Sequence, residues 1–188
     1  MFKEEARSYF QSLREKITTE EIDLLSKKIH SNLISNIDIK QKRISIFLPI
    51  QEKKEINTFQ LLEKFKNTKT TFAAPVSNFK KKSLKHIIID FTPEQIKKNK
   101  FNIPEPTYGE EILSSEFDIV LIPLITFDKK GNRVGYGMGF YDRFLAKCKK
   151  GCLFIGLSIF EQIDQIDDMN NYDIPLNYVI TPDKIYKF

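Results

Sequence analysis

Two short runs of apolar residues limit what this chain can fold into. Residues 118–124 read DIVLIPL, and residues 152–159 read CLFIGLSI. Such continuous apolar character is typical of strands that are covered on both faces, whereas a half-exposed strand alternates apolar and polar residues. Because helices on both sides of a sheet would cover both faces, the two runs predict a mostly parallel sheet between helical layers.

Helix-like and strand-like segments alternate along the rest of the chain. Apolar residues recur every three or four positions through residues 3–16, and again through a second helix that is capped by Thr18 or Thr19. Further helices are predicted at residues 58–66, from Thr92 with Pro93 at the first helical position, and at residues 141–149. Further strands are predicted at residues 43–50, 71–76, 86–91 and 178–181. No linker-like change in composition and no repeat interrupts the pattern, so we expect one α/β domain over residues 1–188.

The composition excludes several classes of protein. The 30 basic and 25 acidic residues leave a net charge of +5, and the lysines are scattered, which favours a solvated surface that would still attract phosphate-bearing ligands. The charged first residues and the lack of a long apolar run predict neither a secretory leader nor a membrane span. Cys148 and Cys152 are the only cysteines, which rules out a disulfide framework and disfavours a zinc site. We therefore expect a protein of the reducing cytoplasm.

Residues 131–145, GNRVGYGMGFYDRFL, carry the strongest indication of function. Gly135, Gly137 and Gly139 alternate with larger residues, and positions without a Cβ atom let backbone N–H groups converge on a ligand. The stretch precedes a predicted helix N-terminus, which favours a phosphate. Its spacing is neither that of the phosphate loop ending in Gly-Lys-Ser/Thr nor that of the dinucleotide-binding G-x-G-x-x-G pattern. A tight, bulged hairpin that binds nothing is the alternative.

Two charged residues beside the glycines favour a bound phosphate over an empty hairpin. Arg133 can make a forked contact with phosphate oxygens, and Asp142 lies where a magnesium ion that bridges phosphates could take a carboxylate ligand. The simpler interpretations are an exposed Arg133 and an Asp142 that only complements the first turn of its helix.

The segment 131–145 resembles the signature of the 5-formyltetrahydrofolate cyclo-ligase family: an arginine, three alternate glycines, a paired aromatic and then Tyr-Asp. The similarity extends from Lys3 to about Thr181. Supporting matches are Lys3 and Arg7, RISIFLPI at 43–50, EINT at 55–58, FNIPEP at 101–106, IVLIP at 119–123 before Phe127-Asp128, and YDIPLNYVIT at 172–181. The resemblance implies a single three-layer α/β/α domain of Rossmann-like type, with the site in a cleft at the carboxyl ends of the strands.

The resemblance also implies an enzyme that closes a ring in a reduced folate. In the implied reaction, ATP and magnesium convert 5-formyltetrahydrofolate to 5,10-methenyltetrahydrofolate, and ADP and phosphate are released. Transfer of a phosphoryl group to the formyl oxygen needs positioning and charge stabilisation but no nucleophilic side chain. The implied partners are a reduced folate and ATP, with no nucleic acid or membrane, and family members are commonly monomeric.

Carried over by position, the resemblance gives roles to residues in the matching motifs. The ATP phosphates would be held by Lys3, Arg7, Arg133, Gly135, Gly137, Gly139 and Tyr141, and magnesium by Asp142 and Asp173. The folate would be bound by Ile50, Glu55, Phe101, Tyr136 and Phe140. Arg133, Tyr141 and Asp142 would form the catalytic centre. The simpler interpretations are a surface acid at Glu55 and core packing at Phe101 and Phe140.

This sequence departs from the family pattern at three places. Met138 stands where relatives often have a basic residue or glycine, and Tyr172 where many have histidine. Residues 124–126, Leu-Ile-Thr, replace small residues and would narrow one wall of the pocket. Residues 80–85 are a place where basic side chains could contact the glutamate tail of a folate.

Two other functions stay open: an ATP-dependent phosphotransferase or ligase acting on another small molecule, and a nucleic-acid-binding module, although no RNP, KH or zinc-finger pattern is present.

Overall fold

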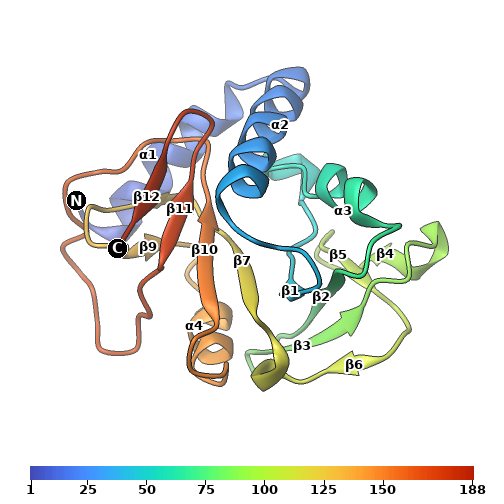
Figure 1. Cartoon of the computed structure of the whole chain (residues 1–188). Coiled ribbons are helices and arrows are strands. Elements are labelled where there is room, and N and C mark those ends of the chain that lie inside the picture. The colour runs from blue at the N-terminus through green and yellow to red at the C-terminus, as the bar shows by residue number, and fades with distance from the viewer.

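The computed structural model describes residues 1–188, except for the side chain of Pro93. Its centre is an eight-stranded sheet in the order β12-β11-β10-β7-β1-β2-β3-β6 (Figure 1). Its strands are β1 (Arg43–Ser45), β2 (Thr71–Asn78), β3 (Ser83–Ile88), β6 (Glu111–Ile112), β7 (Ile119–Pro123), β10 (Leu153–Leu157), β11 (Tyr178–Ile180) and β12 (Ile185–Lys187). The inner pairings β2–β1, β1–β7, β7–β10 and β10–β11 are parallel. The outer pairings are antiparallel. The predicted mostly parallel sheet is therefore confirmed.

Helices and short turns surround this sheet. The helices are α1 (Lys3–Glu15), α2 (Thr19–Asn36), α3 (Phe59–Phe65) and α4 (Phe140–Leu145), and the 3-10 turns are η1 (Gln51–Lys53), η2 (Pro93–Gln95) and η3 (Ser114–Glu116). Two small sheets pair β4 (Ile96–Lys98) with β5 (Pro104–Pro106), and β8 (Thr126–Phe127) with β9 (Arg133–Val134). None of the described helices is both long and apolar enough to cross a membrane. Thr18 begins α2 with a capping box, as the sequence predicts.

The buried strand β7 shows why its sequence is apolar without interruption. Ile119 and Leu121 pack into one core cluster, together with residues of α2 and α3. Val120 and Ile122 point to the other face, where they join residues of α4. Because successive side chains of a strand alternate between faces, a strand with helices on both sides needs apolar residues at every position. The predicted α/β/α layering is confirmed (Figure 1).

Several predicted boundaries are wrong, for local reasons. The strand predicted at residues 43–50 forms a ladder only over β1, although residues 46–49 stay buried. The strand predicted at 86–91 is β3, which begins earlier and ends at Ile88. Thr92 does not cap a helix, because its hydroxyl bonds the Asp90 carboxylate at 2.6 Å, and only the turn η2 follows.

The helix predicted at residues 141–149 is also shorter than expected. It ends as α4 at Leu145, after which Lys147 and Cys148 bond carbonyls three residues back instead of four. The strands β4, β5, β6, β8, β9 and β12 were not predicted, because two or three residues carry no readable periodicity.

Asp128 holds the turn between β8 and β9 in place. It is fully buried. Its Oδ1 accepts hydrogen bonds from the backbone N–H groups of Lys130 at 2.9 Å and Asn132 at 3.0 Å. Its Oδ2 accepts from Asn132 Nδ2 at 2.9 Å and from the Ile166 N–H at 3.1 Å. This carboxylate therefore fixes the turn that leads into the glycine-rich segment.

Replacing Asp128 with alanine should destabilise the fold strongly, because it leaves these buried donors without an acceptor. We expect a loss of about 3 kcal/mol in the free energy of unfolding, which corresponds to a fall of roughly 6–12 °C in Tm. Thermal unfolding followed by circular dichroism measures the change. The matched control is Asp164→Ala, because Asp164 has an 89% exposed side chain and pairs only with Lys129. Equal Tm values for the two variants would contradict this account of Asp128.

Candidate active site

A large cleft opens at the carboxyl ends of β1 and β7. It encloses about 1260 Å³, and its wall includes Phe47 and Leu48, which follow β1, and Pro123, which ends β7. The chain leaves β1 toward β2 on one side of the sheet and leaves β7 toward β10 on the other. Ligands of open α/β sheets bind where the connections diverge in this way. The cleft therefore lies where the fold predicts a site.

The glycine-rich loop, residues 135–139, crosses the cleft between β9 and α4. Gly137 and Gly139 have φ angles of +88° and +63°, a left-handed conformation that disfavours other residues. A Cβ atom on Gly137 would also lie 3.3 Å from Cζ of Arg7. Gly135 has no such constraint, and a Cβ atom there would meet no described atom within 4 Å. The open space beside Gly135 leaves the backbone accessible from the cleft.

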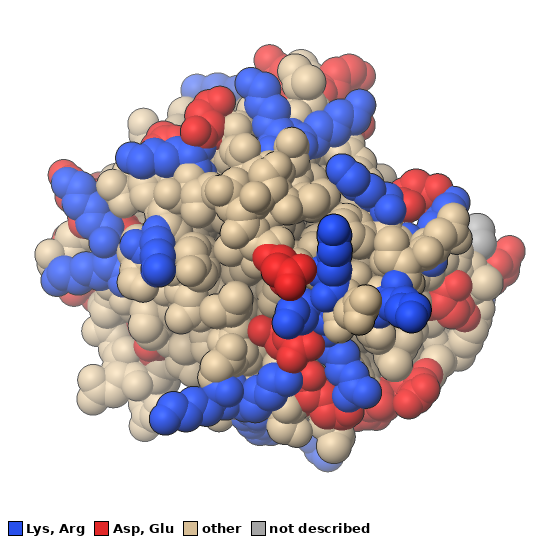
Figure 2. All heavy atoms as spheres, in the orientation of Figure 1, with Lys and Arg blue, Asp and Glu red and all other residues tan. Residues whose placement is uncertain are grey.

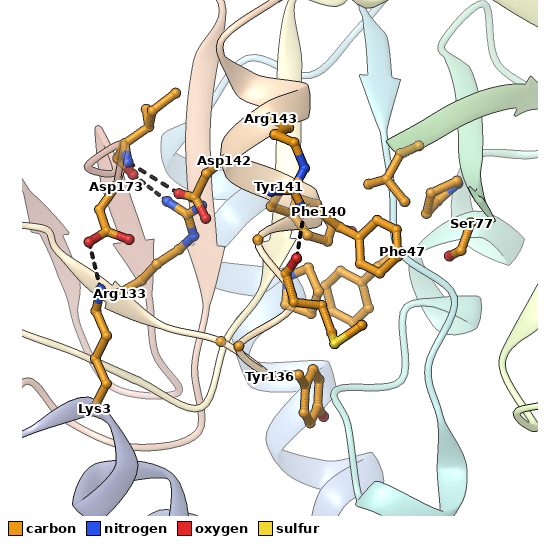
Figure 3. Close-up of a pocket in the computed structure, with 18 of the residues that line it drawn as sticks. Lys3, Phe47, Ser77, Arg133, Tyr136, Phe140, Tyr141, Asp142, Arg143 and Asp173 are labelled. Atoms are coloured by element: carbon orange, nitrogen blue, oxygen red, sulfur yellow. Dashed lines mark hydrogen bonds and ion pairs between the residues drawn. The ribbon is translucent and has the colours of Figure 1, made fainter. Parts of the chain in front are cut away.

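One end of the cleft is charged and contains two ion pairs (Figure 3). Lys3 Nζ lies 2.5 Å from Asp173 Oδ2, and Arg133 Nη2 lies 2.6 Å from Asp142 Oδ1. The N–H of Ile174 also donates to Asp142 Oδ1, at 3.2 Å. Asp142 therefore lies beside the segment that carries Asp173. Because Arg133 is only 9% exposed, the interpretation of it as a merely exposed side chain is wrong.

Arg7 and Tyr141 join this charged end in different ways. Arg7 Nε donates to the carbonyl oxygen of Gly135 at 2.8 Å, which ties α1 to the glycine-rich loop. Tyr141 lines the cleft, but its hydroxyl oxygen is buried and has no hydrogen-bond partner among the described residues. Burial raises the pKa of Tyr141 well above its ordinary value, so the hydroxyl stays protonated.

The other end of the cleft is apolar around one buried carboxylate. Glu55 is 7% exposed, so its interpretation as a surface acid is wrong. Its Oε2 accepts from the Ile50 N–H at 2.7 Å, and its Oε1 accepts from the Tyr136 hydroxyl at 2.6 Å. Burial raises the pKa of Glu55 above its usual range, while these two donors act in the opposite direction. Lys53 Nζ covers the Tyr136 ring, 4.2 Å from its centre.

Aromatic side chains line the mouth of this apolar end. Phe79 contacts Phe101 and Phe140, with ring centres 4.2 Å and 5.3 Å apart. Phe101 is 50% exposed, so core packing does not account for it. Phe140 also lines the cleft. Figure 3 shows Phe140 and Tyr136 on the side of the cleft away from Lys3 and Asp173.

All the residues proposed from the sequence therefore meet in one cleft, and the structure adds others. Phe79 and Lys53 were missed because neither lies in a recognisable motif. Arg143 was missed although it directly follows Asp142; its Nη2 donates to the Met138 carbonyl oxygen at 2.6 Å and its Nε to that of Lys82 at 2.7 Å. It thereby fastens the glycine-rich loop to the turn between β2 and β3.

The departures from the family pattern fall at different depths. Met138 and Tyr172 line the cleft and are 45% and 87% exposed. Residues 124–126 were expected to narrow the pocket, and this expectation is wrong. Their exposed fractions are 3%, 0% and 0%, and they are absent from the described wall of the cleft, because they point into the core instead.

Comparison with known proteins decides the family. The model of the 5-formyltetrahydrofolate cyclo-ligase family matches residues 2–182. The chain belongs to this family. It is 28% identical over 181 residues to the 5-formyltetrahydrofolate cyclo-ligase of Haemophilus influenzae, with 93% of this chain and 94% of the relative covered. It is 34% identical over 131 residues to the enzyme of that name from Mus musculus, covering 66% of this chain and 62% of the relative.

Solved structures agree with this assignment to the cyclo-ligase family. The NMR structure of Aquifex aeolicus 5,10-methenyltetrahydrofolate synthetase superposes with a TM-score of 0.82 at 26% identity, covering 100% of this chain and 93% of that one. A 5,10-methenyltetrahydrofolate synthetase from Mycoplasma pneumoniae shares the fold, with a TM-score of 0.74 at 23% identity over 97% of this chain and 99% of that one. The chain is thus an enzyme of the cyclo-ligase family, as the glycine-rich signature predicts.

Two glycine variants test which position of the loop needs glycine for its backbone conformation. Gly137→Ala should destabilise the protein by about 1–2 kcal/mol, because alanine disfavours the left-handed region, and so lower Tm by roughly 3–6 °C. Gly135→Ala should leave Tm unchanged, because its added Cβ atom meets open space. Thermal melts of both variants test the distinction. A Tm loss at Gly135 as large as that at Gly137 would contradict this difference between the two glycines.

Proposed function

We propose that this chain catalyses the ATP- and magnesium-dependent closure of 5-formyltetrahydrofolate to 5,10-methenyltetrahydrofolate, with release of ADP and phosphate. The observation that carries the proposal is the division of one cleft by the glycine-rich loop. Paired charges lie at one end, and a buried carboxylate among aromatic rings lies at the other. Such a cleft suits a polyanion beside a flat heterocycle. One chain supplies both ends, which supports a single catalytic domain acting as a monomer.

The charged end would hold the phosphates of ATP. Lys3 and Arg7 reach it from α1, and Arg133 reaches it from β9. Gly135, Gly137 and Gly139 leave the backbone open to a ligand, and Tyr141 closes the inner wall. Because α4 spans only Phe140–Leu145, the charged side chains contribute more to anion binding than its helix dipole does.

The aspartates at this end fit a magnesium ion. Asp142 and Asp173 line the cleft, and each keeps one carboxylate oxygen, Oδ2 and Oδ1 respectively, free of hydrogen bonds from the described residues. No group of three or more His, Cys, Asp or Glu side chains that could hold a metal occurs among those residues. Magnesium suits this donor set, because it commonly takes one or two carboxylates and completes its shell with phosphate oxygens and water. When bound, it would neutralise charge on the phosphates.

The apolar end would hold the reduced folate. The Glu55 carboxylate can accept N–H bonds from the edge of the pterin, and Ile50 forms the adjacent wall. Tyr136 and Phe140 offer ring faces to a flat substrate, and Phe101 extends that surface toward solvent. The formyl group would then lie near the glycine-rich loop, between the two ends.

The proposed chemistry places the phosphoryl acceptor next to its donor. The formyl oxygen attacks the terminal phosphorus, and the bond from that phosphorus to ADP breaks. The folate nitrogen N10 then attacks the activated formyl carbon and loses its proton, and phosphate leaves with the former formyl oxygen. The chain's cations would balance charge on the transferred group, and the cleft walls would align the reactants.

A coupled assay tests this function directly. Purified protein mixed with 5-formyltetrahydrofolate and Mg-ATP should give methenyl product, followed by its absorbance, and ADP in equal amounts. If a folded preparation forms neither the methenyl product nor ADP, the proposal is falsified. Production of ADP without a response to folate would indicate another acceptor for the phosphoryl group. The nucleic-acid alternative gains no support from Figure 2, because basic and acidic side chains are interspersed on the face shown.

The Asp142→Asn variant tests the magnesium ligand. The amide oxygen can still accept from Arg133 and from the Ile174 N–H, so folding should be retained, while a negative charge beside the ion is lost. We expect the magnesium concentration for half-maximal turnover to rise by at least about 10-fold. Asp164→Asn, at an 89% exposed carboxylate, is the matched control. Wild-type magnesium dependence in Asp142→Asn would remove Asp142 from the ligand set.

A further inference from the structure

The helix α1 carries a third cation in line with Lys3 and Arg7. Lys3, Arg7 and Arg14 lie within roughly 40° of one another around a helix of about 3.6 residues per turn. The first two reach the large cleft, whereas Arg14 lies in the interior with 7% exposure. A buried guanidinium is unfavourable unless an opposite charge and hydrogen bonds compensate it.

The hydrogen bonds of Arg14 are incomplete. Its Nη2 donates to the carbonyl oxygen of Leu124, just beyond β7, at 2.8 Å. Its Nε is buried and has no hydrogen-bond partner among the described residues. The end of α1 adds a favourable partial negative charge, because Arg14 lies in its last turn. Neither contact brings a full negative charge to Arg14.

Glu55 is a buried acid that shares a small pocket with Arg14. This pocket has room for about 10 Å³, and Leu124 lines it as well. Glu55 also lines the large cleft, whereas Arg14 is not part of its described wall. This pocket is too small to admit a substrate. Arg14 thus adjoins Glu55 away from the wall of the large cleft, while Glu55 itself also lines that cleft.

Other charged or titratable groups also face Glu55. Lys53 and Lys54 come from η1 and the residue after it, Tyr136 from the glycine-rich loop and Tyr141 from α4. Burial raises the pKa of Glu55, and Arg14 and Lys53 oppose that rise together with the Ile50 and Tyr136 hydrogen bonds. Lys53 is exposed, and Lys54 Nζ lies 2.9 Å from the Thr19 hydroxyl. Of the two cations that act on Glu55, Arg14 is the buried one.

We propose that Arg14 is a positioning residue: it holds the negative charge and the orientation of the Glu55 carboxylate for the folate, without touching the substrate itself. The inference rests on the proposed function, because it assigns Glu55 to folate binding. It gives α1 two tasks, since Lys3 and Arg7 serve the nucleotide end of the cleft and Arg14 serves the folate end. Loss of Arg14 should therefore affect one substrate and spare the other.

Steady-state kinetics of Arg14→Met test this selectivity. We expect KM for 5-formyltetrahydrofolate to rise by about 10-fold or more, and KM for ATP to stay within about twofold of the wild-type value. Arg14→Lys, which keeps the charge, should recover most of the loss. The matched control is Arg43→Met, because Arg43 lies on the surface and pairs with Glu116. An equal loss toward both substrates, or no loss, would overturn the proposal.

The pH profile provides a readout that packing alone would not move. If folate binding needs ionised Glu55, kcat/KM for the folate falls as the pH drops through the pKa of Glu55 in the free enzyme. Without Arg14 that pKa rises, so the acid limb should move upward by about one pH unit. In the Glu55→Gln background, Arg14→Met should add little further loss. Arg14 would have only a structural role if the acid limb does not move, or if the losses in kcat/KM caused by Arg14→Met and Glu55→Gln are fully additive.

Folding is checked by circular dichroism on every variant. If Arg14→Met does not fold, the double variant Arg14→Met with Glu55→Gln decides, because it removes the uncompensated carboxylate as well. Recovery of folding would support the pairing, and continued failure would overturn it. A wild-type protein without folate turnover would instead refute the proposed function. If the wild type is active and the Arg14 variants raise KM equally for the folate and for ATP, only the role of Arg14 is refuted.

Discussion

The parallel pairing of β1 with β7 determines where the rest of the site can lie. Two adjacent parallel strands end at the same edge of a sheet, and here their connections leave in opposite directions. Neither the connection from β1 to β2 nor the connection from β7 to β10 therefore covers the edge between β1 and β7, and the cleft forms there. The segments after β1 and β7 then line that cleft, and α1 and the glycine-rich loop reach it from other parts of the chain.

Charge inside this cleft is arranged in compensated sets. Lys3 with Asp173, and Arg133 with Asp142, form pairs whose side chains are mostly shielded from water. Glu55 receives two hydrogen bonds and shares a small pocket with the buried Arg14. Isolated charges would be unstable at such depths, because the interior screens them poorly. The polar groups therefore hold one another in place before any ligand arrives.

The central fold was predictable because β7 and β10 form continuous apolar runs that pack between helical layers. β7 and β10 were recognised for this reason, and the glycine-rich motif located the site between β7 and α4. The short edge strands were not predictable, since a segment such as Ile96–Lys98 is made mainly of exposed polar residues.

Burial of Glu55 was missed for a different reason. The buried Glu55 carboxylate accepts a hydrogen bond from the Tyr136 hydroxyl, 81 residues away in sequence. No local sequence pattern predicts such a contact. Arg14 did leave a signal, because its spacing from Lys3 and Arg7 puts all three on one side of a helix. That signal is visible only when the interior position of Arg14 is known.

The paired charges also affect which ligands the resting cleft would accept under the proposed function. A small anion that contacts Lys3 or Arg133 would have to separate that cation from its aspartate, and it would leave the aspartate without a counter-ion. A metal–nucleotide complex brings a polyanion for the released cations and a cation for the released carboxylates. Under the proposed function, the preformed pairs would therefore favour ligands that carry both signs of charge, and free phosphate would compete poorly with the intact complex.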